Sequence, residues 1–295
     1  MDLIVFLAVL FAAFLHAFWN FLLKGNSDKA LAMCAVTLGH TPFCVARIFY
    51  SGFPDIQAFF YILGGALLHS GYQIALMHAY RFGDLTQIYP IARGLSPLLL
   101  MLATLIIGQD ILSDMQILAI ILVAASLFVF GLSQLRARES GLVSLVMAVT
   151  AGIFIASYSF VDAIGARLSQ NAVSYYSVMS FLNALIMLVY FALVHKGVLL
   201  RLPSEGRKIF WIGGGASYAA YVMVLWACLS APVALVSSLR ETSVLFALFF
   251  GVFFLGEKLT ASRIMATITL IIGWRLSACF DGRWKLLPLQ KEFAL

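Results

Sequence analysis

The sequence predicts an all-α membrane protein of ten transmembrane helices that form two inverted five-helix repeats. Three observations support this fold class: an apolar composition, the recurrence of apolar segments of membrane-spanning length, and a pair of related segments in the two halves of the chain. Together they divide the chain into a first repeat (residues 1–139), a second repeat (residues 140–280) and a polar tail (residues 281–295).

The composition is more apolar than that of soluble domains. Of the 295 residues, 63% are hydrophobic and 11% are charged, and the mean hydropathy is +1.00. Soluble domains contain about 45–50% apolar and ~25% charged residues, so a water-soluble core cannot hide this much apolar surface. The net charge of +6 is typical of basic cytoplasmic loops, and we expect no nucleic-acid partner.

Apolar runs long enough to span a bilayer recur along the chain with short polar breaks between them. Spanning segments must be helical, because open strands would leave backbone polar groups unsatisfied in lipid. The segments lie at residues 3–23, 31–50, 59–80, 85–107, 115–134, 141–161, 172–194, 209–230, 233–255 and 261–280. The longest connection, residues 196–208, is basic, and the excess of basic residues in the odd-numbered loops predicts that these loops are cytoplasmic and both termini external.

Several residue types receive a structural interpretation. Tryptophans near the segment ends, Trp19 among them, are expected to anchor helices at the bilayer interface. The four cysteines show no metal spacing, and we expect neither a metal nor another cofactor. The three consecutive glycines at residues 213–215 favour close helix packing over phosphate binding, since no GK[ST] sequence follows them.

The two halves carry a related segment. ARGLSPLLLMLATLIIGQD, which begins at Ala92, aligns without gaps with RETSVLFALFFGVFFLGEK, which begins at Arg240. Each has a polar start, an apolar run and a glycine followed by two polar residues. Five spans per half is an odd number, so the second half must be inverted in the membrane. Inverted repeats are typical of transporters whose substrate site lies near the midplane, between the halves.

In these features the sequence resembles the drug/metabolite transporter superfamily, and within it the EamA-like branch. The resemblance is carried by the two halves, by YPIARGLSPLL from Tyr89 and by GEKLT from Gly256. The corresponding spot in the first half reads GQDIL, with Gln109 in place of the acid. The resemblance implies a secondary transporter of small metabolites, commonly amino acids or related solutes and often exported, and it does not identify the solute.

Polar side chains inside the spans are the candidate solute-binding residues, because polar stripes in lipid must face the bundle interior. The candidates are Arg93, Arg240, Glu241, Tyr89, His16, Asn20, His69, Tyr72, Gln73, Tyr218 and Tyr221. Two alternatives stay open at this point. The histidines and amides also suit interhelical hydrogen bonds, and the tyrosines also suit plain packing.

The charged candidates lead to a specific expectation. Arg93 lies roughly 12 Å inside its apolar helix, where an unpartnered arginine costs at least ~2.5 kcal/mol. It falls opposite Glu241 in the repeat alignment, so the two are predicted to form an ion pair across the central cavity. Arg240 points to another side of its helix and is predicted to bind a solute carboxylate. Asp162 is expected to pair with Arg167 near the membrane interface, which leaves Glu241 as the candidate proton carrier.

The sequence therefore predicts a secondary active transporter, an exporter or exchanger, of a small polar metabolite such as an amino acid or organic anion. It would work by alternating access in the bacterial inner membrane, as a monomer or weak dimer, with protons as a candidate coupling ion. The alternatives are a non-transporting receptor or scaffold and an intramembrane enzyme. The sequence has no Walker A, H-E-x-x-H or G-x-S-x-G motif, and we do not expect an enzyme.

Overall fold

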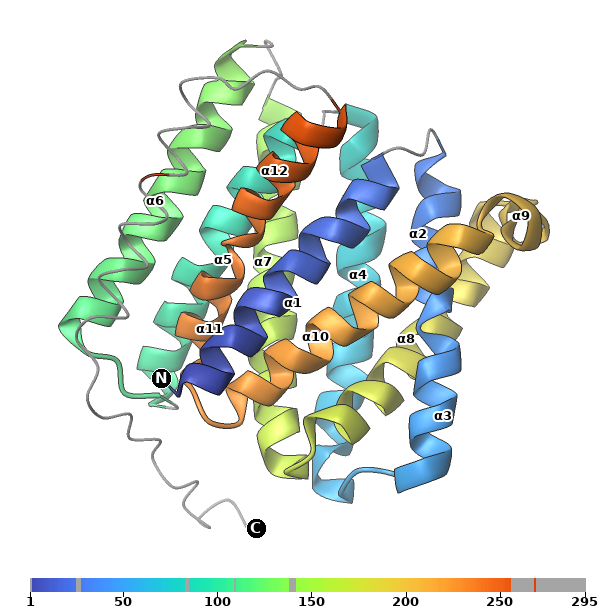
Figure 1. Cartoon of the computed structure of the whole chain (residues 1–295), viewed down its shortest axis with the longest axis horizontal. Helices are drawn as coiled ribbons and strands as arrows, with labels where there is room; N and C mark the ends of the chain where they lie inside the picture. The colour runs from blue at the N-terminus through green and yellow to red at the C-terminus, as the bar shows by residue number, and fades with distance from the viewer. Residues whose placement is uncertain are drawn as a thin grey trace.

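The described part of the molecule is a bundle of helices (Figure 1). The computed structural model describes residues 2–24, 28–82, 85–108, 110–137, 142–255 and 268. The first half contributes α1 (Leu3–Lys24), α2 (Lys29–Gly39), α3 (Thr41–Ser51), α4 (Phe59–Phe82), α5 (Leu85–Ile107) and α6 (Asp114–Ala137). The second contributes α7 (Leu142–Ser169), α8 (Ala172–Val194), α9 (Val198–Glu205), α10 (Gly214–Cys228), α11 (Val233–Arg240) and α12 (Ser243–Leu255).

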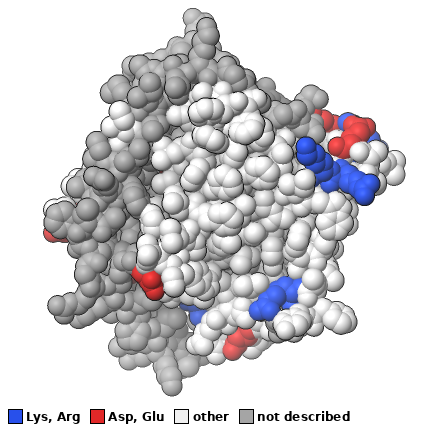
Figure 2. All heavy atoms as spheres, in the orientation of Figure 1, with Lys and Arg blue, Asp and Glu red and all other residues white. Residues whose placement is uncertain are grey.

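Nine segments within the described residues are long and apolar enough to cross a membrane. They coincide with the first nine predicted spans. The tenth, at residues 261–280, and the GEKLT sequence lie outside the described residues, so the ten-helix inverted repeat is not confirmed. Figure 2 shows a broad uncharged surface on the viewed face, with charged atoms at the α9 corner and along the lower rim. The uncharged part of this face suits contact with lipid.

The structure differs from the predicted helices at three places. The second span is divided at His40 into α2 and α3. Pro42 lies in the first turn of α3, the part of a helix that accommodates proline. The basic connection at residues 196–208 contains a helix, α9, which the sequence analysis did not expect. The sixth span continues through residue 169 as α7, so that Asp162 lies within a helix rather than near its end.

The ninth span is interrupted between α11 and α12. The N–H groups of Glu241 and Thr242 bond to carbonyls three residues earlier, at Ser238 and Leu239, over 3.2 and 3.0 Å. The Thr242 hydroxyl also donates to the Leu239 carbonyl at 2.7 Å. These short turns replace the regular α-helical ladder, and they place Glu241 at the junction of two helical pieces.

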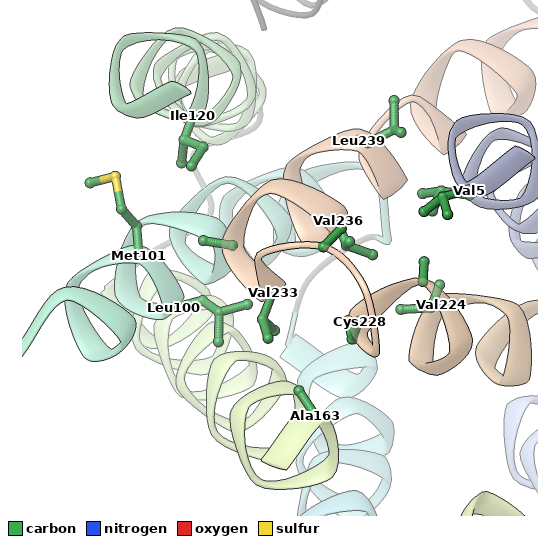
Figure 3. Packing of buried hydrophobic residues seen from close by; sticks show 14 of the residues in the cluster. Val5, Leu100, Met101, Ile120, Ala163, Val224, Cys228, Val233, Val236 and Leu239 are labelled. Atoms are coloured by element: carbon green, nitrogen blue, oxygen red, sulfur yellow. The ribbon is translucent and has the colours of Figure 1, made fainter. Parts of the chain in front are cut away.

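Helix α11 lies at the centre of the bundle, and all eight of its residues are buried. Figure 3 shows Val233, Val236 and Leu239 of α11 among apolar side chains of the surrounding helices. Helix α1 packs on α10, α11 and α12, while α5 packs on α6, α7 and α11. The buried position of α11 brings Arg240, at its end, to the interior of the protein.

Two of the three glycines at residues 213–215, Gly214 and Gly215, serve close helix packing, as predicted. A Cβ atom on Gly214 would meet the backbone of Gly39, and one on Gly39 would meet the backbone around Phe210 and Gly214. A side chain added to Gly215 would press against the ring of Phe43. The end of α2 and the start of α10 can therefore approach this closely only because both carry glycine.

Candidate functional site

A cavity of about 80 Å³ lies between the helices of both halves. Its wall is built by α1, α2, α4, α5, α7, α8, α10 and α11. Seven of the eleven predicted site residues line it: His16, His69, Tyr72, Gln73, Arg93, Tyr221 and Arg240. The space is large enough for several waters or a small polar molecule, and its wall is unusually rich in polar and charged groups for a membrane interior.

Arg93 and Glu241 form the predicted ion pair. The Arg93 Nε donates to Glu241 Oε2 at 2.8 Å, and its Nη2 donates to the Ser243 hydroxyl at 3.3 Å. The two side chains are 2% and 0% exposed, so each would be an isolated buried ion without the other. Arg93 belongs to both the pair and the cavity wall, whereas Glu241 lies behind the wall.

Arg240 is placed differently from its neighbour Glu241, as the helical geometry predicts. It lines the cavity, and its guanidinium lies over the ring of Tyr221, 5.9 Å from the ring centroid. It is only 3% exposed, yet its Nε and Nη2 atoms have no hydrogen-bond partner among the described residues. A buried guanidinium with unused donors is ready to bind an acceptor group.

Asp162 does not pair with Arg167, and the sequence interpretation of this carboxylate was wrong. It is fully buried. Its Oδ2 accepts hydrogen bonds from His69 Nε2 and from the Tyr221 hydroxyl, both at 2.8 Å. Its Oδ1 accepts from the Tyr175 hydroxyl at 3.0 Å. A second carboxylate is therefore buried beside the cavity, and Glu241 is not the only one deep in a span.

Arg167 instead binds at the start of α11. Its Nη2 lies 2.9 Å from Asp110 Oδ1, and its guanidinium donates to the Cys228 and Ala231 carbonyls at 2.8 and 3.1 Å. Asp110 Oδ2 accepts from the N–H of Val233 at 2.8 Å. The carboxylate thus satisfies a backbone donor at the first residue of α11. This clamp fixes the helix that carries Arg240 and Glu241.

The amide candidates divide between two roles. Gln73 lines the cavity and also exchanges hydrogen bonds of 3.3 Å with Asn183, whose Nδ2 donates to the Ser70 hydroxyl at 2.8 Å. Asn20 donates to the carbonyl of His16 on its own helix at 2.7 Å and is not in the cavity wall. Gln73 therefore forms hydrogen bonds between two helices, whereas Asn20 forms a hydrogen bond within its own helix.

Two of the tyrosine candidates, Tyr218 and Tyr89, are not among the described residues of the cavity wall. The Tyr218 hydroxyl shares a hydrogen bond of 2.6 Å with Ser177, and its ring stacks on Phe43 at 5.7 Å, so Tyr218 packs between helices. The side chain of Tyr89 lies outside the described residues. Tyr72, in the wall, packs edge-on against Tyr158 at 5.6 Å.

The sequence analysis missed part of the wall. Trp19, expected at the membrane interface, lines the cavity, and its Nε1 has no hydrogen-bond partner in the described part of the chain. His40 shares a hydrogen bond of 2.8 Å with Ser180. Ser180 and Asn183 belong to a run of polar residues at every third position of α8, starting at Ser174. This spacing of three residues could have predicted a polar face on the helix.

Comparison with known proteins agrees with the fold. Residues 142–279 match the sequence model of the EamA-like transporter family, which confirms the resemblance over the second half. No curated protein matches the sequence. One solved crystal structure has a TM-score of 0.69 at 15% identity, and the alignment covers 94% of this chain and 96% of that one; the similarity shows the fold alone. The family match and the apolar helices identify an integral, multi-pass membrane protein.

Proposed function

Residues 142–279 match the sequence model of the EamA-like transporter family, and on that premise we propose that the protein is a secondary active transporter, an exporter or exchanger, of a small polar metabolite. The solute is an amino acid or an organic anion with at least one carboxylate. It binds in the cavity between the helices, and alternating access moves it across the bacterial inner membrane.

The observation that carries this proposal is the state of Arg240. Two of its donor atoms face no acceptor among the described residues, although the side chain is almost completely buried. Leaving such donors unpaired is costly, and arginine binds a carboxylate through two parallel hydrogen bonds. Arg93 does not offer the same pair of donors, because its Nε and Nη2 already bind Glu241 and the Ser243 hydroxyl.

Other groups on the wall suit the rest of a small metabolite. Trp19 Nε1, His40 Nε2 and the Thr37 hydroxyl are buried and lack hydrogen-bond partners in the described structure. The indole is a donor only, while the imidazole and the hydroxyl can donate or accept. Tyr158 and Tyr221 add aromatic faces to the same cavity. This combination favours a molecule that is polar at several points over a hydrocarbon-like drug.

The packing of the helices supports alternating access between two halves. The third span, α4, packs on the sixth, α7, just as the first, α1, packs on the eighth, α10. Likewise α5 packs on α7, and α1 packs on α11 and α12. Each contact corresponds to its partner when the halves are exchanged. The interrupted ninth span at the cavity is a further feature of inverted-repeat transporters.

The test is solute flux in liposomes that contain the purified protein. A set of radiolabelled amino acids and dicarboxylates is offered at equal concentration. We expect flux of at least one of them, and we expect Arg240→Met to reduce that flux by at least about 10-fold, the equivalent of one lost carboxylate interaction of about 1.4 kcal/mol. Arg207→Met is the matched control, because Arg207 is an exposed arginine that follows the end of α9 and does not line the cavity. Equal flux in both variants would remove Arg240 from the binding site.

A further inference from the structure

We propose that His69 and Asp162 bind the proton that is coupled to transport, and that this proton and the solute carboxylate bind cooperatively. The inference rests on the proposed transport function and deepens it. It assigns proton coupling to a histidine–aspartate pair on the wall between α4 and α7, and not to Glu241.

The geometry gives the pair one member on the cavity wall and one fully buried member. The His69 side chain is 12% exposed and lines the cavity, while the Asp162 side chain is 0% exposed. Because an ionised carboxylate can only accept, the bond of 2.8 Å between them requires that His69 Nε2 carries a hydrogen. Protonation then takes place at the other ring nitrogen, Nδ1. A proton from cavity water adds there, and release to water is the reverse step.

The groups around Asp162 donate hydrogen bonds to its carboxylate, but the two hydroxyls among them supply no positive charge. Besides His69, its described donors are the Tyr175 and Tyr221 hydroxyls, which are neutral. Three donors stabilise a carboxylate anion, yet a buried anion without a counter-ion still costs free energy. Protonated His69 supplies that counter-ion, and histidine is the side chain that ordinarily changes charge near neutral pH.

The charge count around the cavity links the proton to the solute. Among the described residues, Arg93 and Arg240 contribute two positive charges, and Glu241 and Asp162 contribute two negative charges close behind the wall. The cavity is therefore balanced while His69 is neutral. An incoming organic anion, whose carboxylate has no ammonium group beside it, adds an uncompensated negative charge in a medium of low dielectric constant. Protonation of His69 restores the balance, so each of the two ligands raises the affinity for the other.

Other titratable or charged groups line the same cavity, contact Asp162 or, as Glu241 does, pair with a residue of the cavity wall. They are His16 on α1, His40 between α2 and α3, Tyr72 on α4, Arg93 on α5, Tyr158 on α7, Tyr175 and Tyr176 on α8, Tyr221 on α10, Arg240 on α11 and Glu241 after it. The imidazole of His69 contacts the carboxylate of Asp162 directly. Its ring also stacks on Tyr158, with the ring centroids 4.0 Å apart, which holds the imidazole in the orientation that reaches Asp162.

Tyr221 connects this proton site to the proposed carboxylate site. Its hydroxyl donates to Asp162 Oδ2 at 2.8 Å, and its ring lies under the Arg240 guanidinium. A solute carboxylate on Arg240 would therefore lie near the face of the tyrosine ring, and the Asp162 anion lies at its hydroxyl end. This arrangement brings two negative groups to the same side chain, and a proton on His69 would reduce the repulsion between them.

The experiment measures both ligands at once. Liposomes that contain the protein and a pH-sensitive dye receive a mixture of radiolabelled L-amino acids and dicarboxylates outside, without an imposed pH gradient. We expect solute entry in the wild type to be accompanied by proton entry. In a second set of assays the exterior is made acidic, and we expect the apparent solute affinity to rise by about 5–150-fold. In His69→Gln that pH response should fall to about 1-fold. Asp114→Asn, at an exposed carboxylate, should keep it.

The outcomes separate this inference from the function on which it rests. Solute entry without proton movement in the wild type would overturn proton coupling and leave the transporter intact. Absence of solute entry at every pH would overturn both. A pH response that persists in His69→Gln but disappears in Glu241→Gln would assign the proton to Glu241 and reject the pair.

A solute-independent measurement covers the case in which His69→Gln abolishes all flux. Purified wild-type protein with ¹⁵N-labelled histidine should show a ring whose protonation state changes with pH, and whose signal is missing in His69→Gln. The same ring should respond to Asp162→Asn and not to Asp114→Asn. A His69 ring that keeps one protonation state between pH 5 and pH 8 would contradict the proposal.

Discussion

Two carboxylates are buried beside the same cavity, and they are stabilised in different ways. Glu241 is held by the guanidinium of Arg93, and its second oxygen has no hydrogen-bond partner among the described residues. Asp162 is held by one imidazole and two hydroxyls that together reach both of its oxygens. A carboxylate that is paired with a permanent cation depends on that cation. A carboxylate that is surrounded by hydrogen-bond donors depends on no single partner, and in our proposal a proton on the neighbouring imidazole balances its charge.

The largest expected effect is the loss of Arg93. Arg93→Leu leaves Glu241 as an uncompensated buried ion, and breaking a buried pair in this way costs about 3–5 kcal/mol. We expect a large fall in the unfolding temperature of the purified protein in detergent, or failure to accumulate in the membrane. Arg93→Leu combined with Glu241→Leu removes both charges and should regain most of the loss. Equal destabilisation in the single and the double variant would show that the ion pair is not the cause.

An exchange of the two charges tests whether the same pair moves during transport. Arg93→Glu and Glu241→Arg alone should each abolish flux, because each places two like charges within about 3 Å of each other. The double variant should fold again. If folding returns without flux, the pair opens and closes in the transport cycle. If both return, the pair is a static structural element.

A smaller effect is expected for Asp162. Asp162→Asn removes the charge but retains an acceptor oxygen, and the tyrosine hydroxyls can rotate to accept from the new amide. The expected cost is about 1–3 kcal/mol, typical of one impaired buried hydrogen bond, and the unfolding temperature should fall less than in Arg93→Leu. A loss as large as that of Arg93→Leu would show that Asp162 depends on a permanent charge partner after all.

Two adjacent glycines on α4 allow a matched test of the space around Asp162. A Cβ on Gly65 would meet Asp162 Oδ1, the Met179 side chain and the Tyr175 hydroxyl, whereas a Cβ on Gly64 would find only Val161 at an ordinary distance. Gly65→Ala should therefore cost about 1–3 kcal/mol by overpacking. Gly64→Ala should be neutral or stabilise the helix by up to about 1 kcal/mol. Equal unfolding temperatures would mean that α4 shifts freely away from Asp162.

The contrast between the two carboxylates also explains what the sequence could and could not predict. The Arg93–Glu241 pair was predictable because both residues occupy the same position in two related segments, and a charge in lipid demands a partner. Apolar runs likewise predicted the nine spans of the described residues, since spanning length and hydropathy determine them. The end of the sixth span was less predictable, because its helix continues to residue 169. Both inferences need only the linear pattern of the chain.

The surroundings of Asp162 were not predictable by the same reasoning. Arg167 is its nearest cation in the sequence, but the two residues are five positions apart and point to different sides of α7. The partners that hold Asp162 come from α4, α8 and α10, and they are a histidine and tyrosines whose polar role depends on tertiary contacts. The burial of Trp19 in the cavity wall was missed for a related reason, because position near a helix end predicts depth but not the direction of the side chain.

The smallest effect is expected at an ion pair outside the spans, which sharpens the comparison by changing only the environment. Arg201 on α9 binds Asp28 at 2.8 Å and Glu205 at 2.6 Å, distances like that between Arg93 and Glu241, but its side chain is 44% exposed. Water screens such pairs, and they contribute little to stability. Arg201→Leu should therefore leave the unfolding temperature at neutral pH almost unchanged, in contrast to Arg93→Leu.

The pH dependence of this exposed cluster has a defined sign. Burial raises the pKa of Asp28, but the Leu31 N–H and the Arg201 guanidinium outweigh it, so that the pKa lies below its ordinary value of 3.8. The hydrogen bonds from Arg201 similarly lower the pKa of Glu205 below 4.5. A depressed carboxyl pKa adds stability above the unfolded-state value, and this stability is lost as the pH falls through the folded-state value. The difference between wild type and Arg201→Leu, small at pH 7, should therefore begin to shrink near the unfolded-state values of about pH 4. It should vanish once the pH falls below the lowered folded-state pKa values. A difference that grows on acidification would contradict this sign, and a large difference at pH 7 would show that exposure does not separate this pair from Arg93 and Glu241.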